Sequence, residues 1–187
     1  MSPAQTYEER LAERSAALKA AEQKSDRIGN LRLALANVEY AEEVFAPGEL
    51  ERIFLNFSDP WPKARHARRR LTHPRFLDKY CGLLNDNGEI HLKTDSQTLF
   101  EFSLNSFADY GLQMTNISLN LHREGPNEEH VMTEYETKFV GQGINIHRCE
   151  VIVGKEALSR YQKQRLDKYG LRPDKPGQPE EAFSEQP

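Results

Sequence analysis

The chain is most informative at residues 53–63, which read Ile53-Phe54-Leu55-Asn56-Phe57-Ser58-Asp59-Pro60-Trp61-Pro62-Lys63. The first five of these residues are almost all apolar, which predicts a buried strand at 53–57. A carboxylate, Asp59, follows the strand, and Pro60 fixes the backbone directly after it. Open α/β sheets bind ligands beyond the carboxyl ends of their strands. The segment therefore predicts a strand that ends at a candidate ligand site.

A cluster of basic side chains follows this strand. Its members are Lys63, Arg65, Arg68, Arg69, Arg70 and Arg75. The whole chain of 187 residues has a formal net charge of −4, so the cluster lies inside an acidic protein. Arginines with few neighbouring acids suit a partner that carries phosphates, and the alternative is a solvated, charged helix face.

Composition excludes several classes of protein. The mean hydropathy is −0.76 and the chain has no long apolar run, so we expect no membrane span. The N-terminus has no basic flank followed by an apolar stretch, so we expect no signal peptide. Cys81 and Cys149 fit buried thiols in a reducing cytoplasm better than a disulfide. No His or Cys spacing indicates zinc, and no acyl-transfer motif or Walker loop is present, so we expect no metal.

Strands that alternate with helices predict an α/β fold with a mostly parallel sheet, in which the last two strands can pair antiparallel. The predicted strands are residues 31–35, 53–57, 89–94, 112–121 and 144–153. The predicted helices are residues 7–26, a helix with Thr72 as N-cap, a helix between Ser96 and Gly111, 134–139 and 158–169, with a turn at 85–88. The predicted domains are a charged helix at 1–28, an α/β domain at 29–153, and a polar helix with a disordered tail at 154–187.

Three polar residues lie where predicted strands end: Asn37, Asp59 and Asp95. Parallel strands end at one edge of a sheet, so we expect these side chains to face a common crevice. For Asn37, an equally good interpretation is a residue that ends a strand and begins a turn. Two neighbours of Asp59 are also open to two interpretations. Trp61 could stack on a base or belong to the core, and His66 could titrate near neutrality or be an ordinary polar residue.

Several segments resemble the tRNA (guanine-N7)-methyltransferases, over residues 29–153. They read Leu55-Asn56-Phe57-Ser58-Asp59-Pro60-Trp61-Pro62-Lys63, Arg65-His66, Arg69-Arg70-Leu71, His91-Leu92-Lys93-Thr94-Asp95 and Met132-Thr133-Glu134-Tyr135-Glu136-Thr137-Lys138-Phe139. The combination is specific, although no single segment is. The resemblance implies a Rossmann-like class I methyltransferase fold, S-adenosylmethionine as methyl donor, and N7 of the variable-loop guanine of tRNA as the methylated atom.

The resemblance also implies roles for individual residues. Asp59 would be the active-site acid, in contact with both the donor and the base. Asn37 would bind the donor together with Asp59, although the family usually has an Asp at that position. The residues that would bind the substrate are Lys63, His66, Arg69, Asp95, Thr137, Lys138, Phe139 and Val140.

One part of the family pattern is absent from this sequence. The family's first strand, its glycine-rich donor loop and most of its second strand should precede Asn30, but the first glycine is Gly29. We therefore expect a sheet that is truncated at its N-terminal side and has either a gap or an exposed apolar edge. Two functions follow: an active tRNA methyltransferase, or an inactive remnant with a basic tRNA-binding surface. Methylation of another base or of an amide nitrogen agrees less well with the basic cluster.

The absent glycine-rich loop leads to a prediction about the donor. Without that cradle for its methionine end, S-adenosylmethionine should bind this chain weakly or not at all. Isothermal titration of the purified chain with S-adenosylmethionine measures this directly. A micromolar dissociation constant would contradict the expectation.

Overall fold

The computed structural model describes residues 29–125 and 132–169 of the chain. The chain divides into two compact units, Met1–Val44 and Phe45–Pro187. The described part of the first unit holds the short helices η1 (Val38–Tyr40) and α2 (Ala41–Val44). The helix predicted at 7–26 and the tail predicted at 172–187 lie outside the described residues.

The strand predicted at residues 31–35 is wrong. This segment has neither helix nor strand, and Leu31 and Leu35 are 38% and 51% exposed. A strand needs a neighbour whose backbone groups complete its hydrogen bonds, and no described strand pairs with this segment. Apolar residues alone were therefore not enough to fix a strand here.

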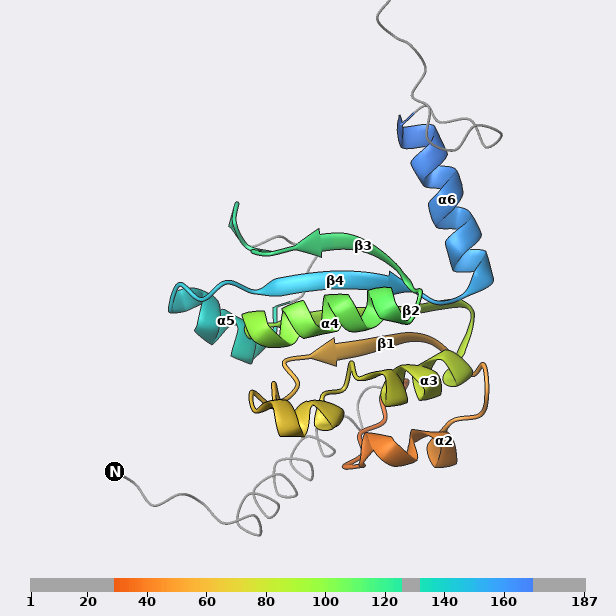
Figure 1. Cartoon of the computed structure of the whole chain (residues 1–187), viewed down its shortest axis with the longest axis horizontal. Coiled ribbons are helices and arrows are strands. Elements are labelled where there is room, and N and C mark those ends of the chain that lie inside the picture. Colours follow the sequence, from red (N-terminus) through yellow and green to blue (C-terminus); the bar gives the residue numbers. More distant parts are fainter. Residues whose placement is uncertain (1–28, 126–131, 170–187) are drawn as a thin grey trace, which may run out of the picture. The chain divides into compact units, whose positions relative to one another are not determined.

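The described part of the second unit contains one four-stranded sheet with the order β1-β2-β4-β3 (Figure 1). The strands are β1 (Leu50–Asn56), β2 (Leu84–Thr94), β3 (Gln113–Ser118) and β4 (His147–Ile152). Strands β1 and β2 are parallel, and β4 is antiparallel to both β2 and β3. Three strands thus run in one direction and only the C-terminal strand β4 runs against them. The predicted α/β class, mostly parallel with an antiparallel C-terminal strand, is confirmed.

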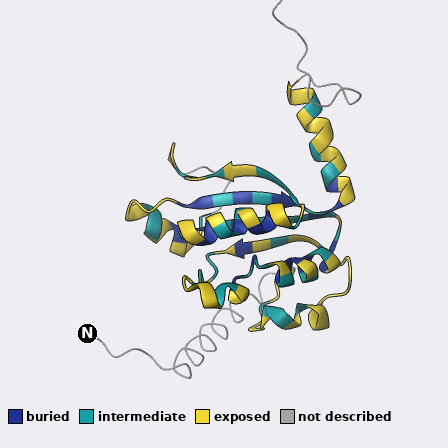
Figure 2. Cartoon of the chain, in the orientation of Figure 1, coloured by how far each residue is buried: buried dark blue, intermediate teal, exposed yellow. Residues whose placement is uncertain are grey.

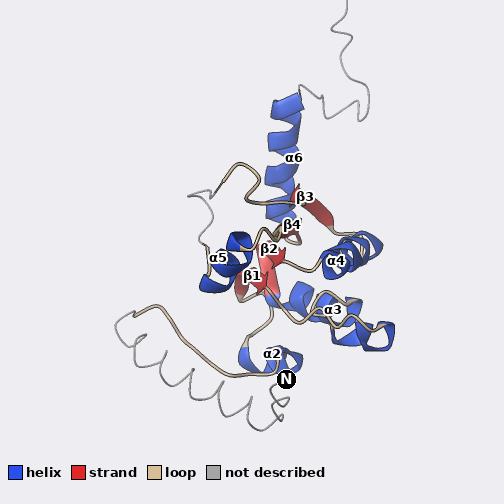
Figure 3. Cartoon of the chain, turned by 90° about the vertical axis from the view of Figure 1, so that its left-hand side faces the viewer, coloured by secondary structure: helices blue, strands red, loops and turns tan. Residues whose placement is uncertain are grey.

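Helices α3 (Pro74–Leu83) and α4 (Gln97–Asp109) lie on one side of the sheet, and α5 (Glu134–Gly141) lies on the other (Figure 3). Side chains of β2 alternate between these faces, because Ile90, Leu92 and Thr94 are buried and the residues between them are half-buried. The buried residues of α3, α4 and β4 complete the core (Figure 2). They include Phe76, Leu77, Tyr80, Leu83, Leu99, Phe100, Phe107, Cys149, Val151 and Ile152.

The local signals around α3 and α4 were mostly interpreted correctly. Ser96 caps α4 by accepting a hydrogen bond from the Leu99 amide, and Gly111 follows the helix with a φ of 79°. Thr72 does not cap α3, because its hydroxyl is buried against Ser103 at 2.8 Å. His73 is the N-cap instead, and its Nδ1 accepts from the Arg75 amide at 3.3 Å.

Residues 85–88 do not form a separate turn before β2. They lie inside the strand as a bulge, because Leu50 pairs with Leu84 whereas Arg52 pairs with Glu89. A bulge of this kind inserts unpaired residues into one strand and changes its course locally. The residues at 85–88 therefore interrupt the regular pairing as a turn sequence would suggest, but strand β2 continues on both sides of them.

The sheet face opposite α3 and α4 carries charged residues. Arg52 pairs with Glu89 at 3.2 Å, and His91 bonds to the same carboxylate at 2.9 Å. Arg148 pairs with Glu150 one strand further along. Helix α6 (Lys155–Tyr169) follows β4 and is largely exposed, as its polar sequence predicts. In the part of the chain that is described, no helix is long and apolar enough to cross a membrane.

Strand β1 is an edge strand of the described sheet. It pairs only with β2, and the side chain of Phe54 is 58% exposed. An edge strand leaves a row of backbone groups without sheet partners. Within the described residues, β1 is therefore the edge strand and carries one exposed apolar residue, Phe54.

A buried ion pair fastens α5 to the sheet. The Glu136 side chain is fully buried and accepts from Lys93 Nζ at 3.1 Å and from His122 Nε2 at 2.8 Å. Burial alone raises the pKa of Glu136, but the hydrogen bonds from His122 and Lys93 and the positive charge of Lys93 outweigh it. The pKa of Glu136 is therefore below its ordinary value. Since Glu136 is held in this way, the position of α5 depends on the charge of this carboxylate.

We predict that Glu136→Gln destabilises the protein by about 3–5 kcal/mol near neutral pH, because the charge of Lys93 loses its buried partner. A carboxylate whose pKa is lower in the folded state stabilises the fold when the pH is above its pKa in the unfolded state. This stabilisation is lost as the pH falls through its pKa in the folded state. The difference between wild type and variant should therefore shrink as the solution is acidified from neutrality. Urea unfolding at several pH values measures it.

The exposed Glu134 in the first turn of the same helix gives the matched control, Glu134→Gln. Its effect should be within about 0.5 kcal/mol at every pH. A destabilisation by Glu136→Gln that does not change with pH would contradict the proposed role of its charge.

Candidate functional site

Asp59 and Asp95 come together at one edge of the sheet. The last residues of β1 and β2 are paired in register, with Leu55 opposite Leu92 and Asn56 opposite Lys93. The Phe57 amide then donates to the Lys93 carbonyl at 2.9 Å, which extends the pairing one residue further. Asp95 directly follows β2, and Asp59 lies three residues beyond β1. The parallel strands therefore carry both carboxylates to the same end, as expected.

Tyr135 of α5 lies close to both carboxylates. Its pKa is raised, first by burial and then by the negative charges of Asp95 and Asp59. Its ring centre lies 5.0 Å from that of Phe57 and 4.4 Å from that of Phe139. These three aromatic side chains form one wall beside the acids, and Tyr135 is still 47% exposed. The edge thus offers carboxylates for hydrogen bonding and an aromatic surface for stacking.

The loop that carries Asp59 has unusual backbone angles on both sides of it. Phe57 and Trp61 have φ values of 52° and 43°, in the left-handed region that bulky residues rarely adopt. Such positions cost about 1–3 kcal/mol each and persist only where surrounding contacts enforce them. The conformation around Asp59 is therefore held by its surroundings.

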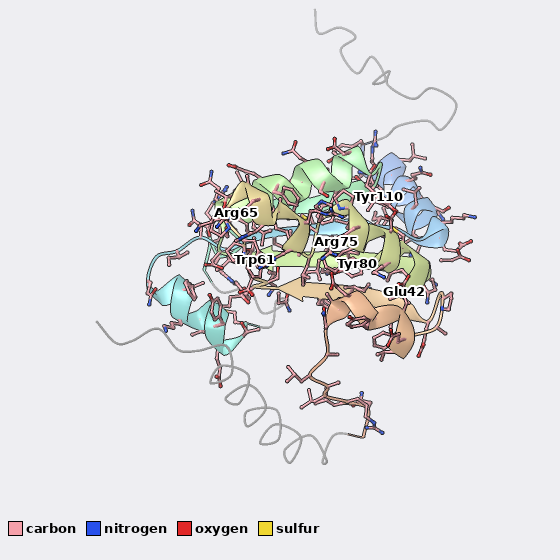
Figure 4. The ribbon with its side chains drawn as sticks, turned by 60° about the horizontal axis from the view of Figure 1, so that its bottom comes forward. Glu42, Trp61, Arg65, Arg75, Tyr80 and Tyr110 are labelled. Atoms are coloured by element: carbon pink, nitrogen blue, oxygen red, sulfur yellow. The ribbon has the colours of Figure 1, made fainter. Side chains whose placement is uncertain are left out.

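The basic cluster is divided by burial. Lys63, Arg65, Arg68 and Arg69 are exposed, around the short helix η2 (Ala64–Arg69), whereas Arg70 is only 8% exposed. Arg65 and Trp61 lie on the same side of the molecule (Figure 4). No carboxylate within residues 29–125 and 132–169 forms an ion pair with the exposed arginines of η2. These side chains remain available to a negatively charged partner, but Arg70 does not.

Trp61 and His66 contact each other in the segment that follows Asp59. Their ring centres are 5.7 Å apart in an edge-on arrangement, and the Arg69 guanidinium lies 4.9 Å from the Trp61 ring centre. His66 Nε2 also accepts from Arg65 Nε at 3.3 Å. Both rings are half-buried, so Trp61 is neither a core residue nor fully open to a base.

Helix α5 presents the predicted segment at residues 137–140. Thr133 caps the helix by accepting from the Glu136 amide at 3.1 Å, and the Thr137 hydroxyl donates to the Thr133 carbonyl at 3.1 Å. Thr137 and Lys138 are exposed, whereas Phe139 and Val140 are half-buried. The roles given to these residues stay predictions.

Asn37 belongs to the other unit, so its predicted place in the crevice stays a prediction. Within its own unit its side chain caps η1, because Oδ1 accepts from the Glu39 amide at 3.0 Å. This use of the side chain agrees with the alternative interpretation of Asn37 as a turn residue.

Sequence reasoning did not single out Glu136, Lys93 and His122 as a group. The spacing Thr133-x-x-Glu136 was an available signal, because it is typical of a helix capping box. In the structure Thr133 caps as that motif requires, but the Glu136 carboxylate turns to Lys93 and His122. Through these contacts the three side chains connect α5 to the end of β2.

The described residues fit only part of a donor site. A carboxylate such as Asp59 fits the cationic sulfonium of S-adenosylmethionine, but these residues provide no glycine-rich loop. A cavity of about 300 Å³ lies between α6 and the charged sheet face and is lined by neither Asp59 nor Asp95. The described part of the chain also contains no group of three or more residues suited to hold a metal ion.

Comparison with known proteins identifies the family. Residues 7–149 match the family described as "Putative methyltransferase". Proteins named tRNA (guanine-N(7)-)-methyltransferase from Macrococcus caseolyticus, a Geobacillus species and Bacillus velezensis are 54%, 55% and 52% identical. The matches cover 66%, 67% and 65% of this chain and 58%, 57% and 56% of those proteins. The chain thus spans less than three fifths of the length of these relatives.

A solved structure gives a weaker match. Geranyl diphosphate C-methyltransferase from Streptomyces coelicolor aligns with 73% of this chain and 60% of that chain, at 12% identity and a TM-score of 0.42. A similarity of this size supports no further conclusion. The sequence match over residues 7–149 is decisive by its extent. The chain belongs to this methyltransferase family.

Proposed function

We propose that this chain carries the acidic edge and the RNA-binding surface of a cytoplasmic tRNA (guanine-N7)-methyltransferase. The enzyme would transfer a methyl group from S-adenosylmethionine to N7 of the variable-loop guanine in tRNA. The names of the similar proteins support the substrate. The observation that carries the proposal is the parallel pairing of β1 and β2, which brings Asp59 and Asp95 to one edge next to the exposed basic helix η2.

The chemistry of this reaction suits a site with few polar groups. Guanine N7 carries a lone pair in the plane of the ring and no proton, so no general base is needed. When bound, S-adenosylmethionine supplies a methyl group on a positively charged sulfur. The protein then has to hold N7 about 3–3.5 Å from that methyl group and in line with the leaving sulfur. Orientation of the base is therefore the main task of the residues at this edge.

Asp59 and Asp95 can orient and stabilise the base. Guanine presents N1–H and an amino group, and hydrogen bonds from such donors to a carboxylate contribute roughly 1.5–3 kcal/mol each. Methylation at N7 also turns the neutral base into a cation. Fixed negative charges beside the ring favour that change, because they interact more strongly with the transition state than with the substrate.

The remaining predicted residues fall into two groups around the acids. Lys63, His66 and Arg69 lie on or next to η2 and would contact the RNA backbone. Thr137, Lys138, Phe139 and Val140 lie on α5 and would approach the substrate from the side of Tyr135. Asn37 would contact the donor.

The test of this proposal is incorporation of tritiated methyl groups from S-adenosylmethionine into unmodified tRNA. Because we expect weak donor binding, the assay uses a high concentration of S-adenosylmethionine. Under that condition we expect incorporation by the wild type and a loss of about 100-fold or more in Asp59→Ala, the size of effect seen when one stabilising group is removed from a catalytic site. Asp109→Ala, at the exposed C-terminal end of α4, is the matched control and should keep wild-type activity. Equal activity of Asp59→Ala and wild type would refute the role of Asp59.

The alternative function is a remnant that binds tRNA and does not methylate it. Two observations favour keeping it: the exposed arginines of η2 lack carboxylate partners in the described part of the chain, and the described residues supply only part of a donor site. Salt-sensitive binding of tRNA without methyl incorporation by the wild type would support this alternative.

Both functions predict the same electrostatic behaviour at η2. The logarithm of the binding constant falls with the logarithm of the salt concentration. In Arg69→Ala this slope should be less steep by about 0.7–0.9, the value for one phosphate contact. Arg52→Ala is the control, because Arg52 pairs with Glu89 on the sheet. Filter binding of labelled tRNA over a salt series measures both slopes. An unchanged slope in Arg69→Ala would remove Arg69 from the RNA-binding surface.

A further inference from the structure

Arg70 differs from the other members of the basic cluster because its charge is directed into the protein. Its side chain is 8% exposed. Nε donates to the Pro60 carbonyl at 3.1 Å and to the Trp61 carbonyl at 3.4 Å, and Nη2 donates to the Trp61 carbonyl at 3.0 Å. The planar guanidinium therefore grips two successive carbonyls of the loop that follows Asp59.

A ring covers the guanidinium. Its central carbon lies 4.4 Å from the centre of the Phe102 ring on α4. Across residues 29–125 and 132–169, no carboxylate forms an ion pair with Arg70. The buried charge is balanced by carbonyl dipoles and the face of an aromatic ring, which is a weaker compensation than an ion pair. A cation held in this way indicates that its hydrogen-bonding geometry is needed.

The loop needs support on its carbonyl side. Pro60 and Pro62 have no amide hydrogen, so the backbone on both sides of Trp61 cannot donate a hydrogen bond to the rest of the fold. Phe57 and Trp61, on either side of Asp59, both have left-handed backbone angles. A segment with few donors and two strained residues would relax unless its carbonyls were held, and Arg70 holds two of them.

We propose that Arg70 is a positioning residue, which fixes the backbone of residues 59–61 and thereby the place of Asp59 beside Asp95. Arg70 is next to the exposed basic residues in the sequence, but it is buried and does not belong to their surface. The proposal rests on the proposed function of Asp59 for its effect on catalysis, but its structural part can be tested alone. Trp61, the single tryptophan of the chain, lies in the gripped segment and reports on it.

The test compares Arg70→Lys with the wild type and with Arg123→Lys, a control at an exposed loop position. Lysine keeps the charge but cannot bond two carbonyls with a planar fork. We expect a red shift of Trp61 emission and stronger quenching by acrylamide in Arg70→Lys, with the far-ultraviolet circular dichroism unchanged. Arg123→Lys should match the wild type in all three measurements.

The same variants separate positioning from RNA binding. In Arg70→Lys the salt slope of tRNA binding should stay unchanged, and kcat for methyl transfer should fall by about 100-fold without a change in KM for tRNA, as for a misplaced catalytic group. If the wild type shows no methyl transfer, the proposed function fails, while the fluorescence still decides the role of Arg70. If folded Arg70→Lys had the emission and quenching of the wild type, the proposal would be overturned. A salt slope of tRNA binding that is less steep by about 0.7–0.9 would overturn it as well, because Arg70 would then contact a phosphate.

A second variant covers the case in which Arg70→Lys does not fold. Phe102→Leu removes the ring beneath the guanidinium and leaves every hydrogen bond of Arg70 possible. It should shift Trp61 emission and quenching in the same direction and by less. Unchanged fluorescence in Phe102→Leu, together with an unfolded Arg70→Lys, would show that Arg70 supports the core and not the loop.

Discussion

The parallel register between β1 and β2 is the constraint on which this molecule depends. Leu55 and Leu92 are opposite each other and face α3 and α4, while charged residues of the same strands face the other side. Sliding one strand by a single residue would exchange the two faces and put charges into the core. The register that buries the core therefore also determines how far Asp59 lies from Asp95. Stability and site geometry are two results of one pairing.

Elements with strong local signals were predictable from the sequence. The apolar run at 53–57 and the cap at Ser96 both specify structure within a few residues, and both predictions agree with β1 and α4. The prediction of a strand at 31–35 was wrong, because a strand also requires a partner and local apolar residues do not supply one. At α3 both Thr72 and His73 could have been the N-cap, and the structure has His73. Burial and the charges of Arg68 and Arg75 lower the pKa of His73. That favours the neutral ring, which can accept the hydrogen bond.

The site was partly predictable, because local sequence signals also locate the ends of strands. Asp59 and Asp95 were found because the end of a strand can be located in a sequence. Arg69 and Arg70 are neighbours of the same type, yet Arg69 is exposed beside the Trp61 ring and Arg70 is buried against Phe102. The buried partnership of Glu136 with Lys93 was also hidden, because a sequence shows charge but not depth. Tertiary packing decides which charges meet solvent, and no local pattern encodes it.

The open side of β1 has a consequence for the behaviour of the protein in concentrated solution. The seven residues of β1 carry charges only near their start, at Glu51 and Arg52, and the run that follows is uncharged. Uncharged segments of this length with high strand propensity stack readily on identical copies and can seed fibrils. Natural proteins usually place charged residues or prolines within or beside such segments. Here Glu51 and Arg52 precede the uncharged run and Asp59 and Pro60 follow it, so the flanking residues limit the pairing of this edge with further copies of the chain.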